Sequence, residues 1–246
     1  MIALTHISMK FGPEVLALDD VSLTIPSGQY VVVVGPNGSG KTTLLNVIAG
    51  ALLPAAGSVF FDDRDVTRFV EHRRSRWVAR VFQNPLSGTA PELSILENFR
   101  LASLRTSHAG LRIGVNTAFR GLVRDRIATL GMGLENKVDQ LMGTLSGGQR
   151  QALTLLMSVM DKTDVLLLDE PTAALDPRSA SLVLATADRL IREHGLTALL
   201  ITHNLRDAHA YGNRLIQMSM GRVVRDLDAA GKDALDLPSL FSWFSE

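Results

Sequence analysis

Residues 35–42 read Gly35-Pro36-Asn37-Gly38-Ser39-Gly40-Lys41-Thr42, which is a complete G-x-x-x-x-G-K-[ST] phosphate-binding loop. The apolar, largely β-branched run Tyr30-Val31-Val32-Val33-Val34 precedes it, as in a buried parallel strand. A helix-like stretch, 42–49, follows, and Gly50 stands where such a helix ends. Because a strand and a helix flank the motif, it predicts a site for the phosphates of a nucleoside triphosphate rather than a chance turn.

Each residue type in this loop suits the binding of a phosphate chain. Glycines let the backbone wrap around a phosphate, and the N–H groups at the start of the following helix point toward it. Lys41 places a cation beside the β- and γ-phosphates, and a charge pair at about 4 Å in an effective dielectric of about 20 is worth roughly 4 kcal/mol. The hydroxyl of Thr42 is a candidate ligand for Mg²⁺.

The composition bounds the class of protein. The chain has 246 residues, enough for one large domain or for a core with an inserted subdomain. Lysine plus arginine and aspartate plus glutamate both number 25, and this neutral balance argues against a dedicated nucleic-acid binder. There are no cysteines, which excludes disulfides and thiolate metal sites. Residues 1–6 do not resemble a signal peptide, and no apolar run approaches the ~20 residues of a membrane span, so we expect a soluble protein.

Strand and helix patterns alternate along the chain. We expect strands at residues 2–8, 21–25 (after a turn at 17–20), 57–61, 77–82, 165–168 and 198–202, a helix at 178–193, and a hairpin of 215–218 with 222–225. This alternation predicts an α/β fold: a P-loop NTPase core with a mixed, mainly parallel sheet, an N-terminal antiparallel β subdomain and an inserted α-helical subdomain. In such sheets the chemistry collects at the carboxyl ends of the strands.

The inserted segment is predicted to be helical and rich in arginine. It runs from Pro91 to about Thr144 and begins with Leu93, Leu96, Glu97 and Arg100; Arg105, Arg112, Arg120, Arg124 and Arg126 make it basic, and Gly110 and Gly114 interrupt it. A further helix follows, whose buried face we expect at Leu153, Leu156, Met157 and Met160. Together, this segment and that helix form the predicted helical subdomain, approximately residues 91–160. The whole chain, residues 1–246, is predicted to be a single domain. We expect these arginines, and the cluster Arg73-Arg74-Ser75-Arg76 with Arg80, to lie on solvated faces.

Two acidic residues follow the predicted strand 165–168. Asp169, at the strand end, can hold Mg²⁺ through an oxygen or a water. Glu170 can polarise an attacking water. An acidic strand cap is common by itself, but the phosphate-binding loop upstream favours the catalytic interpretation.

The stretch Leu145-Ser146-Gly147-Gly148-Gln149 is the most discriminating one in the chain. A serine and two glycines at a helix start expose backbone donors, so they predict a second anion site. One chain binds one nucleotide, so this second site has no purpose in a monomer. It is explained if it faces the nucleotide of another copy.

Taken together, the motifs resemble those of ATP-binding-cassette (ABC) ATPases in kind and in order. The phosphate-binding loop, VFQNP, LSGGQ, VLLLDE, AALD and Thr202-His203 carry the resemblance, which covers nearly the whole chain. It implies a head-to-tail homodimer with two ATP molecules, and Mg²⁺, between the chains. The implied contacts to ATP are Gly35, Pro36, Asn37, Gly38, Ser39, Gly40, Lys41, Thr42 and Thr43, and from the opposite copy Ser146, Gly147, Gly148 and Gln149.

The resemblance also implies a role for residues outside those two motifs. Asp169 resembles the metal-holding acid, together with Thr42, and Glu170 the general base. Gln83 is similar to the loop glutamine that senses Mg²⁺ and the attacking water and couples to a membrane partner. The remaining implied roles are γ-phosphate contact for His203, linkage of the two sites across the dimer for Asp176, and adenine stacking for Phe11. Alone, Phe11 could be plain core and His203 a structural residue.

A closer resemblance is to the ATPases of tryptophan/tyrosine-type importers, whose permeases are similar to those of branched-chain amino acid and ribose importers. Residues 83–91, 131–135 and 212–216 carry it. It implies a peripheral ATPase at the cytoplasmic face of the cell (inner) membrane that drives a separate permease. The expected cargo is an amino acid or a similar small solute, a substrate-binding protein is a further expected partner, and nucleic acid is not.

Alternatives remain open at the level of the sequence. The chain could be the motor of a lipid or lipoprotein exporter, or a non-transport ABC ATPase, although the latter usually carries two fused cassettes or a long coiled-coil insertion. The arginine-rich segment could touch the permease or lipid headgroups instead of water. Residues 237–244 are expected to pack on the chain's own core, with a second copy as the alternative.

Overall fold

The computed structural model describes residues 1–12, 15–105 and 114–244, and within these residues the centre of the fold is a six-stranded sheet. All neighbouring strands in it are parallel except the β9–β10 pair. Across the sheet the strands are β10 (Arg222–Leu227), β9 (Arg214–Ser219), β3 (Tyr30–Val34), β8 (Thr197–Ile201), β7 (Val165–Asp169) and β6 (Val78–Val81).

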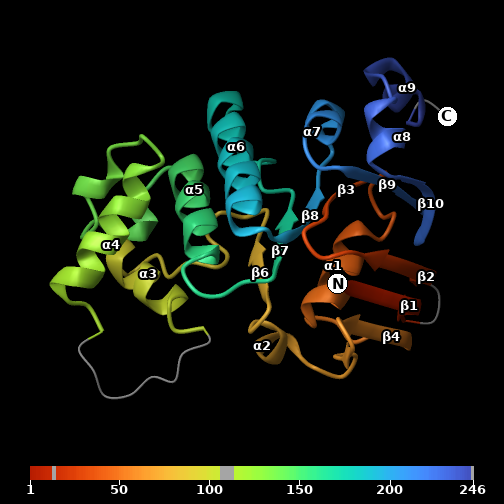
Figure 1. The fold of residues 1–246 in the computed structure, drawn as a ribbon, viewed down its shortest axis with the longest axis horizontal. Coiled ribbons are helices and arrows are strands. Elements are labelled where there is room, and N and C mark those ends of the chain that lie inside the picture. Colours follow the sequence, from red (N-terminus) through yellow and green to blue (C-terminus); the bar gives the residue numbers. More distant parts are fainter. Residues whose placement is uncertain (13–14, 106–113, 245–246) are drawn as a thin grey trace.

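A four-stranded antiparallel sheet lies beside this core (Figure 1). Its strands, in order, are β2 (Val15–Ile25), β1 (Ile2–Phe11), β4 (Ala56–Phe61) and β5 (Arg64–Asp65). The helices of the described residues are α1 (Lys41–Ala49), α2 (Glu71–Arg74), α3 (Ile95–Ala102), α4 (Thr117–Ala128), α5 (Gly147–Ser158), α6 (Pro177–His194), α7 (Leu205–Ala210), α8 (Ala229–Asp233) and α9 (Leu237–Ser242), with short 3₁₀ turns at Leu134–Asn136 and Met142–Thr144. The predicted α/β architecture with an N-terminal antiparallel sheet is confirmed.

The turn predicted at residues 17–20 is wrong, because these residues belong to strand β2. Leu18 pairs with Met9 of β1, and the ladder continues past an irregularity to Val21. Asp20 has a φ of 53°, a left-handed conformation that absorbs the irregularity. The polar pair Asp19-Asp20 therefore marks a bulge inside a strand rather than its end.

The central strands are buried on both faces, as their continuous apolar runs predict. Val31 and Val33 of β3 pack with α1 and the antiparallel sheet, whereas Val32 and Val34 pack with α5 and α6. Figure 1 shows this layering, with α1 between the two sheets and α5 and α6 on the other side. Because β3, β7 and β8 run parallel, their carboxyl ends meet at one edge of the sheet.

Helix α5 is buried more completely than its pattern predicts. Instead of one apolar face, every residue from 150 to 158 is buried, and Met160 lies beyond the helix end. The helix packs against β6, α3, α4 and α6 at once. Its polar side chains find partners: Gln151 donates to the backbone oxygen of Phe82 at 2.8 Å. The prediction of a single buried face fails because neighbours cover α5 from several sides.

Two arginines of the predicted solvated cluster are not solvated, which contradicts that prediction: Arg74 is buried and the side chain of Arg80 is only 10% exposed. Arg74 is fully buried, and its guanidinium donates to the backbone oxygens of Val47 and Ile48 at 2.6 and 2.9 Å. These carbonyls belong to the last turn of α1, where no further turn of the helix can satisfy them; that of Val47 also accepts from the N–H of Gly50 at 3.3 Å. Arg80 is the second, and it pairs with Asp169. The neighbours Arg73 and Arg76 are exposed, as predicted.

Replacing Arg74 should destabilise the fold. Arg74→Ala removes a donor from the backbone oxygens of Val47, Ile48 and Phe69, of which only that of Val47 also accepts from Gly50, so we expect the free energy of unfolding to fall by about 3 kcal/mol or more. Arg76→Ala, at an exposed position on the same segment, should change it by no more than about 0.5 kcal/mol. Urea denaturation followed by circular dichroism measures both, and equal stability of the two variants would contradict the capping role of Arg74.

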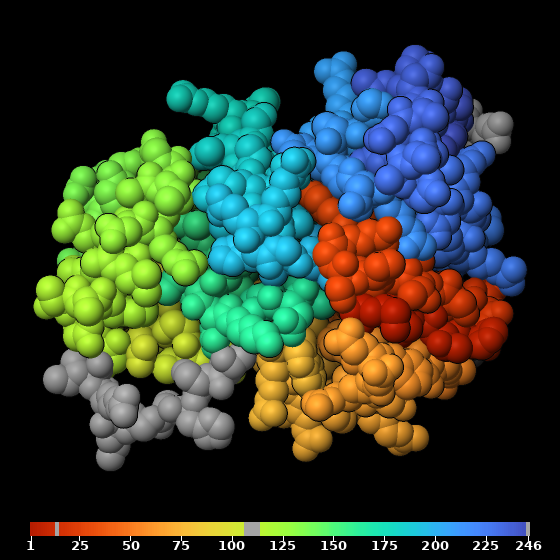
Figure 2. All heavy atoms as spheres, viewed as in Figure 1, coloured from red at the N-terminus to blue at the C-terminus, as the bar shows by residue number. Residues whose placement is uncertain are grey.

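Helices α3, α4 and α5 lie together at one end of the molecule (Figure 1), and Figure 2 shows α3 and α4 as a separate lobe on this face of the surface. Arg124 is exposed and the side chain of Arg120 is 40% exposed, as predicted, whereas Arg105 and Arg126 are partly buried. Arg120 pairs with Asp139 at 2.6 Å, and Arg124 and Arg126 donate to backbone oxygens of Glu135 and Val159. Arg105 donates to Lys162 and Thr163. Arg112 and Gly110 lie outside the described residues.

The C-terminal segment packs on the chain itself, as expected for residues 237–244. Leu240 is fully buried, α9 lies against α7, and the guanidinium of Arg225 lies 4.8 Å from the ring of Trp243. Phe241 and Phe244 remain partly exposed. Within the described part of the chain, no helix combines the length and the apolar character needed to cross a bilayer.

Candidate nucleotide-binding site

The phosphate-binding loop begins where β3 ends and leads directly into α1. Lys41, the first residue of α1, is buried, and its Nζ donates to the backbone oxygens of Gly35 and Pro36 at 2.8 and 2.9 Å. The ammonium group thus lies across the inside of the loop. Burial lowers the pKa of Lys41, and the negative charges of Glu170 and Asp169 act in the opposite direction.

Glycines are required at both ends of this loop. Gly35 and Gly40 have φ values of 153° and 98°. A Cβ at Gly40 would clash with the backbone oxygen of Ala17, and one at Gly35 would clash with that of Met218. The loop lies this close to the backbone of β2 and β9, so only residues without a Cβ fit at these two positions.

The residues present fit a phosphate chain with its cation. The hydroxyl of Ser39 is buried and, within the described residues, has no hydrogen-bond partner, so a polar group is left for a ligand. The hydroxyl of Thr42 donates to Oδ1 of Asp169 at 3.3 Å, which brings together two oxygens of the kind that Mg²⁺ prefers. Thr43 follows on α1.

Asp169 is held by more than the sequence predicts. It ends β7, is buried, and pairs through Oδ2 with Arg80 of the neighbouring strand β6 at 2.6 Å. Arg80 donates at the same time to Oδ1 of Asn46 on α1. Neither partner is predicted from the sequence, although a charged residue inside the predicted strand 77–82 was a usable signal.

Glu170 and His203 come together beside the loop. They follow the ends of β7 and β8, and His203 Nε2 lies 2.6 Å from Glu170 Oε1. Glu170 has a φ of 49°, a conformation that is uncommon for a non-glycine residue and that recurs at functional sites. Its N–H donates to the backbone oxygen of Ile201. Both side chains line one hollow of about 590 Å³, so they can act on the same group.

The tip of α5 is a capped helix start. Ser146 Oγ accepts from the N–H of Gln149, while Gln149 Oε1 accepts from the N–H of Ser146. The N–H groups of Gly147 and Gly148, in the first turn, have no partner within the helix. Gly148 lies so close to Ser179 that a Cβ would not fit. Among the described residues, no hydrogen bond or ion pair joins this tip to the phosphate-binding loop of the same chain.

Three further predicted residues lie apart from this cluster. Asp176 caps α6 by accepting from Arg178 and Ser179, and these hydrogen bonds hold its pKa below the usual value. Gln83 is exposed in the loop after β6. Phe11 is 45% exposed at the end of β1, which excludes the alternative of a core residue and leaves its ring available for stacking.

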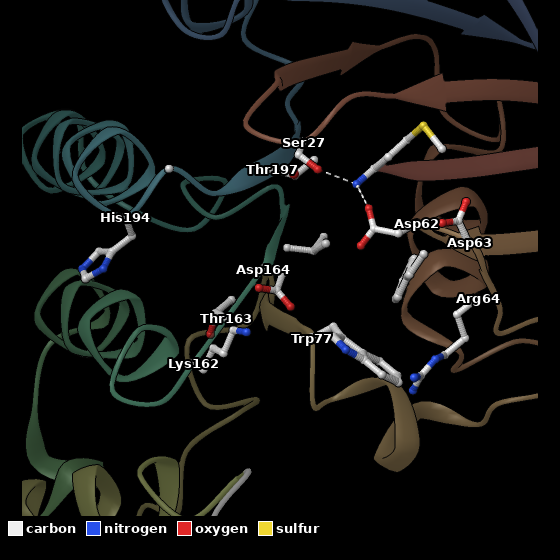
Figure 3. Close-up of a pocket in the computed structure, with 14 residues that line it drawn as sticks. Ser27, Asp62, Asp63, Arg64, Trp77, Lys162, Thr163, Asp164, His194 and Thr197 are labelled. Atoms are coloured by element: carbon white, nitrogen blue, oxygen red, sulfur yellow. Dashed lines mark hydrogen bonds and ion pairs between the residues drawn. The ribbon is translucent and has the colours of Figure 1, made fainter.

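A hollow of about 810 Å³, larger than the one lined by Glu170 and His203, is elsewhere and contains none of the predicted residues. Figure 3 shows it between Asp62, Trp77, Asp164 and His194. It lies at the amino ends of β7 and β8, whereas the predicted residues gather at the carboxyl ends. Volume alone would therefore point to the wrong edge of the sheet.

The fold and this loop define a P-loop nucleotide-binding protein. A model of the ABC transporter family matches residues 18–173. The tyrosine transport ATP-binding protein of Clostridioides difficile is 35% identical, over 99% of this chain and 98% of that protein. The phosphonates import ATP-binding protein PhnC of Agrobacterium fabrum is also 35% identical, over 91% and 78%.

Solved structures agree with this assignment. The cassette MJ0796, as a dimer in a post-hydrolysis state bound to ADP and Pi, matches with a TM-score of 0.78 and 28% identity over 93% of this chain and 99% of that one. The ADP conformation of the ABC transporter cassette MJ1267 matches with a TM-score of 0.80 and 26% identity over 100% and 99%. The chain belongs to the ABC transporter family, as an ATP-hydrolysing subunit of a transporter.

Proposed function

We propose that the chain works as a homodimer that hydrolyses ATP to drive a separate permease for the import of amino acids or a similar small solute. The observation that carries the proposal is the meeting of Lys41, Asp169, Glu170 and His203 at one edge of the central sheet. The full-length similarity to a tyrosine transport protein supports the cargo class. Similarity to phosphonate importers supports import, and is the reason that the cargo needs a direct test.

Each residue of the cluster has a chemical task in this proposal. The loop from Gly35 to Thr43 binds the phosphates, with the cation of Lys41 beside them. Thr42, Asp169 and Gln83 would hold Mg²⁺, which offsets phosphate charge when it is bound. Glu170 accepts a proton from the attacking water, and His203, hydrogen-bonded to it, orients the carboxylate.

The second copy completes each ATP site. Ser146, Gly147, Gly148 and Gln149 form a helix start in which the N–H groups of Gly147 and Gly148 have no partner within the helix, and this polarity suits a phosphate. Asp176, near the start of α6, would connect the two sites, and Phe11 would stack on adenine. The fold is then one domain, residues 1–246, whose helical subdomain spans about 91–160.

A groove beside Gln83 suits a segment of the permease. It has a volume of about 580 Å³, and its lining combines apolar residues, among them Phe82, Leu101 and Met157, with polar ones such as Asn98 and Arg105. Leu101 is 54% exposed there. A large exposed apolar side chain indicates a contact surface when it lies beside other apolar residues, as Leu101 does beside Phe82 and Met157. The subunit would then sit peripherally at the cytoplasmic face of the membrane.

Leu101→Asp tests this docking. A charge in the groove should weaken binding to the permease by about 2 kcal/mol, that is roughly 30-fold, because a buried apolar anchor is lost. ATP hydrolysis by the isolated subunit should be unchanged. Leu122→Asp, at a similarly exposed leucine of α4, is the matched control. Co-purification from membranes measures the effect, and full retention of the permease by Leu101→Asp would remove the groove from the proposal.

Reconstitution tests the function itself. The subunit, its permease and a substrate-binding protein in liposomes should take up an amino acid in an ATP-dependent manner, whereas phosphonate uptake or export of lipid would favour the other transport classes. Tight ATP-dependent binding to ribosomes or DNA would revive the non-transport alternative.

A further inference from the structure

Arg80 is a buried cation at the nucleotide site that the sequence places only in a basic cluster. Its side chain and that of Asp169 are each 10% exposed. One guanidinium nitrogen donates to Oδ2 of Asp169 at 2.6 Å, and another donates to Oδ1 of Asn46 at 2.6 Å. A charge so far from water requires partners, and these two hydrogen bonds determine where the guanidinium lies.

The pairing of β6 with β7 explains why these groups meet. The strands are parallel and Arg80 lies opposite Leu167, so Arg80 and Asp169 project from the same face of the sheet. That face packs on α1, which carries Asn46. Phe82, which follows the end of β6, has its ring centre 4.6 Å from the guanidinium carbon. Arg80 is thus fixed by three separate elements.

This arrangement divides the two oxygens of Asp169 between two tasks. Oδ2 is held by Arg80, while Oδ1 lies 3.3 Å from the hydroxyl of Thr42. We propose that Arg80 is a positioning residue, which fixes the rotation of the Asp169 carboxylate so that Oδ1 faces the Mg²⁺ position beside Thr42. The inference rests on the proposed function, because it concerns the metal of the same ATP site.

Arg80 has a second, opposing effect, since a positive charge near a cation site disfavours the cation. Positioning should prevail for two reasons. The charge of Arg80 is already offset by the carboxylate that it contacts, and Mg²⁺ accepts only near-ideal octahedral geometry. The two effects predict opposite results on removal of the guanidinium: misplacement of Asp169 weakens Mg²⁺ binding, whereas relief of repulsion strengthens it.

A metal titration decides between them. Binding of a fluorescent ADP analogue is followed as Mg²⁺ is added to wild type and to Arg80→Met, so that the readout does not depend on turnover. We expect the Mg²⁺ midpoint of Arg80→Met to rise about 10-fold or more, as is typical when a group that orients a metal ligand is removed. Nucleotide affinity in EDTA should match wild type, since the phosphate-binding loop is intact. Arg76→Met, an exposed arginine, is the control.

Two conservative variants separate positioning from general damage. Arg80→Lys keeps a charged donor and should give a midpoint between wild type and Arg80→Met. Asn46→Ala removes the other hydrogen bond of Arg80 and should shift the midpoint in the same direction by less. If Arg80→Met does not fold, the Mg²⁺ midpoints of Arg80→Lys and Asn46→Ala test the inference in its place. An unchanged or lower midpoint in the folded variants would overturn the inference, whereas wild type that binds no nucleotide would contradict the proposed function instead.

Discussion

Glu170→Gln is expected to bind ATP normally but to hydrolyse it about 10²- to 10⁴-fold more slowly than wild type, the range that a general base contributes. The amide keeps the size of the side chain and an oxygen for the contact with His203. In wild type this contact joins His203 Nε2 and Glu170 Oε1 at 2.6 Å. What it loses is the ability to take a proton from water. Single-turnover hydrolysis and equilibrium ATP binding, measured on the same sample, separate the two properties.

The matched control is Glu193→Gln, at an exposed glutamate near the far end of α6. It should hydrolyse ATP at the wild-type rate. Normal turnover by Glu170→Gln would remove Glu170 from the role of base, and loss of ATP binding would assign it to the binding of the nucleotide.

The second large effect is expected for Lys41→Ala, and it should appear in ATP binding itself. A cation about 4 Å from a phosphate charge in a partly buried site is worth roughly 4 kcal/mol, which corresponds to an approximately 10³-fold loss of affinity. The low exposure of Lys41 supports the larger end of such values, because water screens the charge less.

Isothermal titration with ATP measures this loss. Lys137→Ala, at an exposed lysine, controls for the change in net charge. Because Lys41 also donates to the backbone oxygens of Gly35 and Pro36, the thermal stability of Lys41→Ala should be recorded alongside. Unchanged ATP affinity in the folded variant would contradict the assignment.

The features that the sequence predicts well are those that depend on neighbouring residues. The phosphate-binding loop follows β3 because an apolar run ends in glycines, and Asp169 and Glu170 follow β7 for the same kind of local reason. Parallel strands place all their carboxyl ends at one edge, so the meeting of Lys41, Glu170 and His203 follows from topology.

The features that the sequence does not predict depend on partners far along the chain. Arg74 and Arg80 stand in the same basic stretch as exposed arginines, and only the positions of α1 and of Asp169 distinguish them. Helix α5 is covered from several sides by elements that the helical pattern does not reveal. The bulge at Asp20 has the composition of a turn, and only its pairing with β1 shows that the strand continues.

The central claim is that two copies of the chain complete each ATP site. It is tested most directly by the mass in solution of Glu170→Gln with Mg²⁺ and ATP, measured by light scattering after size-exclusion chromatography. We expect twice the mass of one chain with ATP and the mass of one chain without it. A Glu170→Gln sample that binds ATP and still elutes as a single chain, with its permease also present, would contradict it.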